Sequence, residues 1–180
     1  MAIYSSLADI LDYPAHPIAR QVEGCAAELA THSPEAQAHL VQFQSALAGE
    51  SLGQIQETYT NAFDLRPDCT TNLGYHLFGD DGRRGLFLAE LKGRMEARGI
   101  APGFELPDHI SLLLRYMHIA QEERSTLIED CMLPAVSRMV EVLGATENPY
   151  KHALRALLSL LQYEQEAFSA QAEPMGSLRS

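Results

Sequence analysis

Two carboxylates and an imidazole lie within five residues near the middle of the chain, in the stretch Glu105-Leu106-Pro107-Asp108-His109. Carboxylate oxygens near a helix start accept hydrogen bonds from backbone N–H groups that have no partner inside the helix. The same oxygens can bind the amides or the cationic side chains of a peptide. Local rules therefore leave two interpretations open: a capped core helix, or the polar entrance of a peptide-binding site.

The histidines do not predict a metal site, although the chain contains seven of them. His109 and His118 are nine residues apart, which places them on opposite faces of one helix at about 100° per residue. No pair has the H-x-x-x-H or E-x-x-H spacing found at helical metal sites. We expect His76 to pack in the core.

Motifs for catalysis are also missing from the sequence. There is no glycine-rich phosphate-binding loop and no nucleophile motif of the G-x-S-x-G type. The stretch 79–85 holds three glycines and two arginines, but its two aspartates would repel phosphate, and a flexible loop is favoured. We therefore expect no catalytic residue and no metal site.

The composition is that of an acidic globular protein, with 180 residues, 46% hydrophobic residues and a net charge of −11. That charge argues against nucleic acid or anionic lipid as the main partner, because both attract basic surfaces. It suits a cationic partner, although solubility alone explains many acidic proteins. The three cysteines are far apart and form no C-x-x-C pair, so we expect buried free thiols in a reducing compartment.

Targeting segments are not recognised in the sequence. The N-terminus lacks a basic region followed by an apolar stretch, which a secretory signal would need. No run of about 18 apolar residues, the length of a membrane span, occurs anywhere in the chain. We therefore expect a cytoplasmic protein.

Apolar residues recur at helical spacing through almost the whole chain. The clearest example is the stripe formed by Leu52, Ile55, Tyr59 and Phe63, which lie three or four residues apart. Asp64 follows and is expected to end this helix. Tyr59 and Phe63 would offer an aromatic wall on the stripe, or would be buried in the core.

A second helix is predicted over 111–120, directly after the acidic stretch. Proline is favoured in the first turn of a helix, so Pro107 is expected to open it, with Asp108 as the capping carboxylate. Tyr116 lies on the apolar face of this helix and would offer a second aromatic wall. The polar stretch would thus sit at the entrance of a largely buried helix.

No convincing strand is found, because β-branched runs and hairpin dipeptides are scarce. We predict an all-α fold, a single-domain helical bundle of about eight or nine helices over residues 1–170, with a flexible tail over 171–180. Other boundaries are marked by capping and breaking residues: Ser33-Pro34 and Asn148-Pro149 as helix starts, Gly99 as a left-handed helix end, and Pro134 as a kink or split.

Several short motifs, taken in the order in which they occur along the chain, resemble the nitrate reductase delta-subunit family. These are the NarJ-type molybdenum-cofactor assembly chaperones within the TorD/DmsD-like group. The likeness covers residues 3–165, and E-L-P-D-H is its most specific part. Members of that family often carry a longer charged C-terminal tail than this chain has. The matching stretches are Ile10-Leu11-Asp12-Tyr13-Pro14, Tyr59 to Asp64, Thr71 to Leu86, Glu105 to His109, and Tyr150 with the leucines after it.

The resemblance implies a cytoplasmic chaperone rather than an enzyme. Such proteins bind the immature catalytic (alpha) subunit of a nitrate-reductase-type molybdenum enzyme, notably its N-terminal peptide. They promote insertion of molybdopterin guanine dinucleotide before the subunit docks at the membrane. The cofactor is not expected to bind the chaperone stably, and the chaperone is expected to be a monomer or weak dimer.

A peptide client would need an apolar groove with a few polar anchors. Carboxylates would accept its cationic residues, while Arg84 would pair with Asp64 or Glu105 and hold the fold. Two alternatives remain open: a structural subunit retained in a mature molybdenum reductase complex, and a small helical metal-binding protein. The expected peptide-binding residues are Tyr59, Phe63, Asp64, Arg84, Glu105, Leu106, Pro107, Asp108, His109 and Tyr116.

Overall fold

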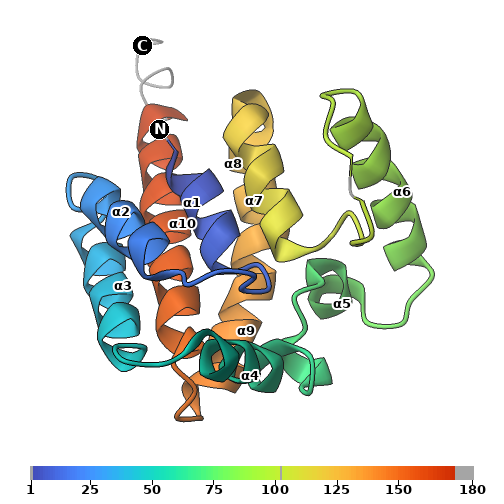
Figure 1. Ribbon diagram of the computed structural model, residues 1–180. Helices are drawn as coiled ribbons and strands as arrows, with labels where there is room; N and C mark the ends of the chain where they lie inside the picture. The colour runs from blue at the N-terminus through green and yellow to red at the C-terminus, as the bar shows by residue number, and fades with distance from the viewer. Residues whose placement is uncertain (1, 102, 173–180) are drawn as a thin grey trace.

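Helices make up the regular structure of the protein in the computed structural model, which describes residues 2–101 and 103–172 (Figure 1). Within these ranges there is no strand, only an isolated bridge between Asn72 and His109. The α-helices are α1 (Ile3–Ile10), α2 (Ala19–Leu29), α3 (Pro34–Ala46), α4 (Leu52–Phe63), α5 (Leu73–Phe78), α6 (Arg83–Glu96), α7 (Ile110–Ile119), α8 (Arg124–Leu127), α9 (Leu133–Gly144) and α10 (Tyr150–Ala172).

Three shorter helical segments complete the chain. Two 3-10 turns, Pro67–Cys69 and Gln121–Glu123, precede α5 and α8, and a π-helical turn, Ile128–Met132, joins α8 to α9 without a break. If α8 and α9 are counted as one helix, the described residues hold nine, and the predicted all-α fold is confirmed. Of the predicted tail, 171 and 172 continue α10, while 173–180 lie outside the described residues.

Seven of the helices form what we call the bundle: α1 to α3 and α7 to α10. The long α10 packs along α3 and α9, and α1 packs on α2 and α7 (Figure 1). Fully buried side chains such as Phe43, Leu113 and Tyr150 fill the space between them. Each large apolar side chain buried in this way contributes about 1.5–3 kcal/mol. No helix in the described part of the chain is both long enough and apolar enough to cross a membrane.

The expected helix boundaries are confirmed at several caps. The Ser33 hydroxyl accepts a hydrogen bond from the Ala36 N–H at 3.3 Å, and Asn148 Oδ1 accepts one from the Tyr150 N–H at 2.9 Å. Gly99, three residues after the end of α6, has a φ of 74°, a left-handed conformation that glycine adopts at little cost. The Ile100 N–H then donates to the Met95 carbonyl, the bond that closes a Schellman motif.

At Pro134, where the sequence predicts a kink or split, the helix changes type but is not split. Pro134 occupies the first turn of α9, where its missing N–H does least harm, and the π-helical turn lies directly before it. The chain therefore stays helical from α8 through α9 with a local change of helix type.

The start of α7 differs from the prediction. Pro107 and Asp108 lie outside the helix, which begins at Ile110 with His109 as its N-cap. The reason is two backbone hydrogen bonds to a segment far away in the sequence. The Ile110 N–H donates to the Thr71 carbonyl at 2.8 Å, and the Leu73 N–H donates to the Asp108 carbonyl at 2.9 Å. The acidic stretch forms turns and is held against the start of α5 by these two hydrogen bonds.

Helices α5 and α6 form what we call the flank. In Figure 1, α6 stands at the edge of the molecule, and it packs chiefly on α5. Only Leu91 and Met95 of α6 are fully buried, while Leu86 is 76% exposed. Helix α6 therefore contributes few buried apolar side chains, whereas α5 packs on α9 with Leu73 fully buried.

Candidate functional site

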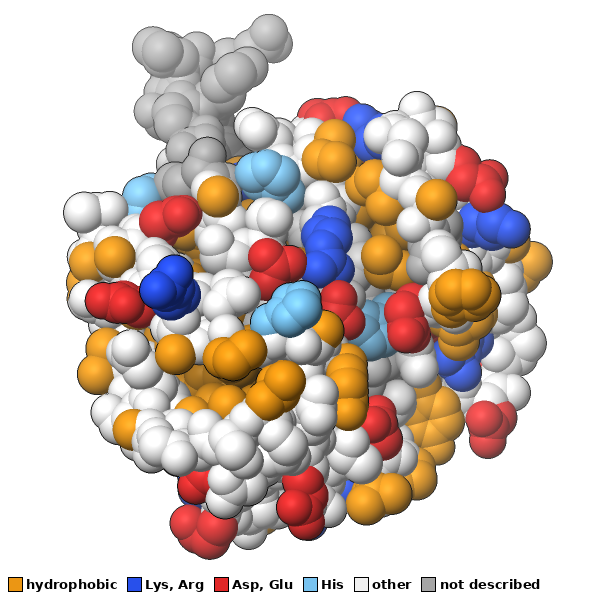
Figure 2. Space-filling view, viewed as in Figure 1, with side chains coloured by type: hydrophobic (Ala, Val, Ile, Leu, Met, Phe, Trp, Pro, Cys, Tyr) orange, Lys and Arg blue, Asp and Glu red, His pale blue; other side chains and the backbone are white. Residues whose placement is uncertain are grey.

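A cavity of about 480 Å³ opens where the end of α1, α4, the turn after α4 and the segment before α7 meet. We call this cavity the acidic pocket. Acidic and histidine side chains gather near the centre of the face shown in Figure 2, over the place where these elements come together in Figure 1. Half of the predicted residues line the pocket, namely Tyr59, Phe63, Asp64, Glu105 and His109.

Three carboxylates line the acidic pocket, those of Asp12, Asp64 and Glu105, and its lining includes no lysine or arginine. Asp12 is paired outside the lining with Arg115, whose guanidinium lies 3.2 Å from Asp12 Oδ2. No ion pair in the described ranges involves Asp64 or Glu105. Like charges that share a cavity repel one another, so a cationic group entering the pocket would be favoured.

The aromatic residues form the floor of the pocket rather than an open wall. Tyr59 and Phe63 are each only 3% exposed. Their ring centroids are 4.9 Å apart, and both rings pack edge-on against Tyr150 at 5.4 and 5.3 Å. The Tyr59 hydroxyl donates to the Leu11 carbonyl at 3.4 Å, and burial raises the pKa of Tyr59 above its ordinary value. This floor is fixed by the core beneath it.

His109 lines the pocket and also caps α7. Its Nδ1 accepts a hydrogen bond from the Ser111 N–H at 3.3 Å, so the neutral ring carries its proton on Nε2. Burial lowers the pKa of His109 below 6.5, and this effect outweighs the nearby charges of Glu105 and Asp12. At neutral pH the ring is therefore uncharged and does not neutralise the carboxylates.

Asp108 is turned away from the acidic pocket and is fully buried. Its Oδ2 accepts hydrogen bonds from the Gly74 N–H at 3.1 Å and from the Arg84 guanidinium at 3.2 and 3.3 Å. Gly74 lies in the first turn of α5, so Asp108 caps α5, not α7 as predicted. Arg84 pairs with Asp108 and not with Asp64 or Glu105, because α6 places it beside α5.

The remaining predicted residues also lie outside the pocket lining. Leu106 is exposed and Pro107 is buried, and neither lines the cavity. Tyr116 is fully buried, and its hydroxyl donates to Glu123 Oε2 at 2.8 Å. The expected second aromatic wall at Tyr116 is therefore wrong, because its ring faces α6 and the turn after α7.

Six lining residues were not predicted from the sequence. Asp12, Tyr13, Thr71 and Asn72 belong to stretches that the family resemblance matched, and this was the one signal that could have found them. Pro67 and Thr70 lie in the segment between α4 and α5, where no helical periodicity marks a face. These unpredicted residues are Asp12, Tyr13, Pro67, Thr70, Thr71 and Asn72.

No group of three or more histidine, cysteine, aspartate or glutamate side chains is placed to hold a metal ion within the ranges described. The three cysteines are buried and free, and burial raises the pKa of the Cys25, Cys69 and Cys131 thiols to about 12. These thiols are therefore protonated at neutral pH and poor nucleophiles.

Comparisons with known proteins agree with one another. The model of the family described as "Nitrate reductase delta subunit" matches residues 26–169. The chain is also 27% identical over 124 residues to the "Probable nitrate reductase molybdenum cofactor assembly chaperone NarJ" of Bacillus subtilis (strain 168), a match that covers 68% of this chain and 67% of that protein. Nine of the eleven lining residues of the acidic pocket fall within the family match, and Asp12 and Tyr13 precede it.

Proposed function

The chain belongs to the nitrate reductase delta subunit family, and from this premise we propose that it is an assembly chaperone for the catalytic subunit of a nitrate reductase. In this proposal it binds the N-terminal peptide of the immature subunit in the cytoplasm, while the molybdenum cofactor is inserted and before the subunit docks at the membrane. The printed name of the Bacillus subtilis relative supports the role in cofactor assembly.

The observation that carries the proposal is a pocket lined by acidic residues without a cation of its own. Asp64 and Glu105 line the same cavity, one at the end of α4 and the other in the segment before α7, so both would attract a cationic side chain that enters it. Charge-assisted hydrogen bonds of this kind are stronger and shorter than neutral ones. The net charge of −11 would also speed the encounter with a basic peptide.

Apolar contacts are available next to the acidic residues of the pocket in the sequence. Each of its three acidic residues is followed or flanked in the sequence by large exposed apolar side chains: Tyr13 after Asp12, Leu65 after Asp64, and Phe104 and Leu106 around Glu105. Such side chains can bury the apolar neighbours of a cationic residue in a bound peptide. The proposed client segment therefore combines at least one lysine or arginine with apolar residues on either side.

The proposed role is binding, without a chemical step by this chain. The cofactor belongs to the client and is not assigned to any residue described above. A chaperone must release its client, so a modest interface with a salt-sensitive electrostatic part is expected. The rigid aromatic floor would reduce the ordering cost of binding, because Tyr59 and Phe63 are already packed.

Titration calorimetry with a synthetic N-terminal peptide of the catalytic subunit tests this proposal. We expect binding at low salt, and we expect Asp64→Asn and Glu105→Gln each to weaken it about tenfold, the effect of losing one charge-assisted hydrogen bond. Glu57→Gln is the matched control, because Glu57 is an exposed acidic residue on the same helix as the Tyr59–Phe63 floor, outside the pocket.

Two results would count against the proposal. If the wild-type protein does not bind the peptide at low salt, the chain does not recognise this part of the subunit. If Glu57→Gln weakens binding as much as Asp64→Asn does, the peptide responds to overall charge and the acidic pocket is not its site.

A further inference from the structure

Helix α6 has little apolar anchoring for its length of 14 residues. Leu91 and Met95 are its only fully buried side chains, and it also contains Gly85 and Gly93, where an added Cβ would meet nothing within 4 Å. Packing therefore does not require glycine at either position. Glycine in an exposed helix interior is destabilising relative to alanine, so α6 is an intrinsically weak helix.

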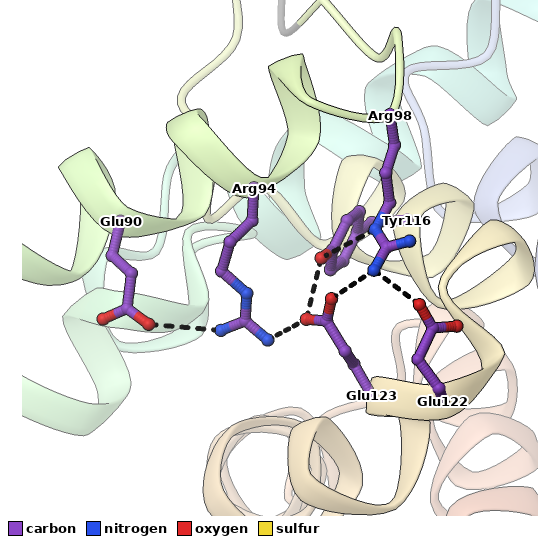
Figure 3. Close-up of polar contacts among 6 residues, drawn as sticks. All are labelled: Glu90, Arg94, Arg98, Tyr116, Glu122 and Glu123. Atoms are coloured by element: carbon purple, nitrogen blue, oxygen red, sulfur yellow. Dashed lines mark hydrogen bonds and ion pairs between the residues drawn. The ribbon is translucent and has the colours of Figure 1, made fainter.

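Polar contacts fasten the second half of α6 to α7 and to the 3-10 turn after it (Figure 3). We call Arg94, Arg98, Tyr116, Glu122 and Glu123 the Glu123 cluster. Glu123 accepts hydrogen bonds from the Tyr116 hydroxyl at 2.8 Å, from Arg98 at 2.6 Å, and from Arg94. Glu122 contacts Arg98 alone, at 2.6 Å, and its side chain is 64% exposed. Glu123 is thus the common acceptor of the cluster.

The cluster stabilises the charge on Glu123. Burial alone would raise the pKa of this carboxyl, but hydrogen bonds from Arg94 and Tyr116, together with the charges of Arg94 and Arg98, lower it below its ordinary value of 4.5. The guanidinium groups also lie over the Tyr116 ring, 5.9 and 5.7 Å from its centroid. Removing the charge on Glu123 would leave both arginines without their shared partner.

Glycines that allow the chain to change direction lie on both sides of α6. Gly79 before α6 and Gly99 after it have positive φ values of 59° and 74°. Glu105, which lines the acidic pocket, lies six residues beyond Gly99. The chain that leaves α6 thus reaches the pocket lining within a few residues, so we expect the position of α6 to affect where Glu105 lies.

We propose that α6 opens as a unit while the bundle stays folded, and that Glu123 holds it closed and thereby positions Glu105 at the acidic pocket. Glu123 is in this sense a positioning residue, since it lies outside the pocket lining. The part of this proposal that concerns client binding rests on the function proposed above. The part that concerns opening does not, and it is tested on the free protein.

Hydrogen exchange on the full chain, followed by mass spectrometry, tests the opening. In Glu123→Gln we expect the amides of α6 to exchange about tenfold faster, as for loss of one charge-assisted hydrogen bond, while those of α3 and α10 are unchanged. Glu122→Gln is the matched control, since it removes the same charge one residue away and leaves the Arg94 and Tyr116 contacts in place.

Three results would overturn the opening controlled by Glu123. If the α6 amides keep their wild-type rate in Glu123→Gln, other contacts hold the helix. Exchange could instead rise equally in α3, α6 and α10, which would mean unfolding of the whole domain. Equal effects of the two variants would remove the special role of Glu123.

Peptide affinity of the same variants tests the link to the acidic pocket. We expect Glu123→Gln to bind the N-terminal peptide several-fold more weakly than Glu122→Gln, and we expect bound peptide to slow α6 exchange in the wild type. Unchanged affinity with faster α6 exchange would disprove the positioning of Glu105. Absence of binding by the wild type would instead disprove the proposed function, and the exchange result would still decide whether α6 opens.

Discussion

In the bundle, α3, α9 and α10 meet through buried apolar side chains. In the flank, α6 meets the segment before α7, α7 itself and the turn after it largely through polar contacts, those of Arg84 with Asp108 and those of the Glu123 cluster. Both regions are helical, and both have apolar residues at helical spacing. They differ in what covers those residues: Tyr150 is enclosed by Phe43, Tyr59 and Phe63, but α6 covers only two fully buried side chains of its own.

Because of this difference, the contacts that stabilise the bundle are not the ones that fix the position of the flank. Apolar burial is non-directional and scales with area, so it explains why the bundle is stable. Hydrogen bonds and ion pairs are directional and respond to pH and salt, so they can fix where the flank lies without adding much stability. The acidic pocket lies between these two regions, with its aromatic floor on the bundle side and Glu105 on the chain that returns from the flank.

The largest effect on the flank is expected from Asp108→Ala. This change removes the cap of α5 and leaves Arg84 without a partner, and breaking a buried ion pair from one side costs about 3 kcal/mol. Urea unfolding at constant pH measures the loss. Asp108→Asn keeps an oxygen that can accept from the Gly74 N–H, so it should lose less stability.

A variant in the bundle should behave differently from Asp108→Ala. Leu113→Ala should cost about 2–5 kcal/mol through the cavity it leaves. Hydrogen exchange should then rise in every bundle helix together, while Asp108→Ala should raise it first in α5 and α6. If the two variants show the same exchange pattern, the flank is not a separate unit and the contrast between the two regions fails.

A smaller loss of stability is expected from Gly74→Ala, which changes the α5 side of the contact with Asp108. An added Cβ would lie 2.6 Å from Asp108 Oδ2 and 3.2 Å from the Phe87 ring, so the buried carboxylate must move. Overpacking of this kind costs about 1–3 kcal/mol. Urea unfolding measures it, with Gly53→Ala on α4 as the control, because nothing lies within 4 Å of a Cβ there. Equal stability of the two variants would show that Asp108 shifts without cost.

Helices were predictable from the sequence because their signals are local. The stripe from Leu52 to Phe63 and the Ser33 cap each lie within a few turns of one helix, and both are confirmed. Pro134 is also a local signal, because its effect on its own helix follows from its missing N–H. What these signals report is where a helix runs and which side is apolar.

The candidate site was less predictable because its geometry depends on distant partners. Asp108 caps Gly74, which lies 34 residues earlier in the chain, so the helix-start rules assigned it to the wrong helix. Tyr116 carries the same apolar periodicity as its neighbours, yet its hydroxyl is directed at Glu123. Periodicity cannot distinguish an aromatic side chain beside a cavity from one beneath a neighbouring helix.

The smallest expected effect comes from Gly93→Ala, and it separates the two regions most directly. Alanine should stabilise α6 by about 0.5–1 kcal/mol, because it lowers the entropy of the open chain and meets no neighbour. If α6 opens independently, this gain slows exchange in α6 and leaves the global free energy of unfolding almost unchanged. Gly24→Ala makes the same change in α2 of the bundle, also in open space, and should raise the global value without altering α6. A global gain from Gly93→Ala equal to that from Gly24→Ala would mean that α6 unfolds only with the bundle, and the polar contacts would then join the two regions into one cooperative unit.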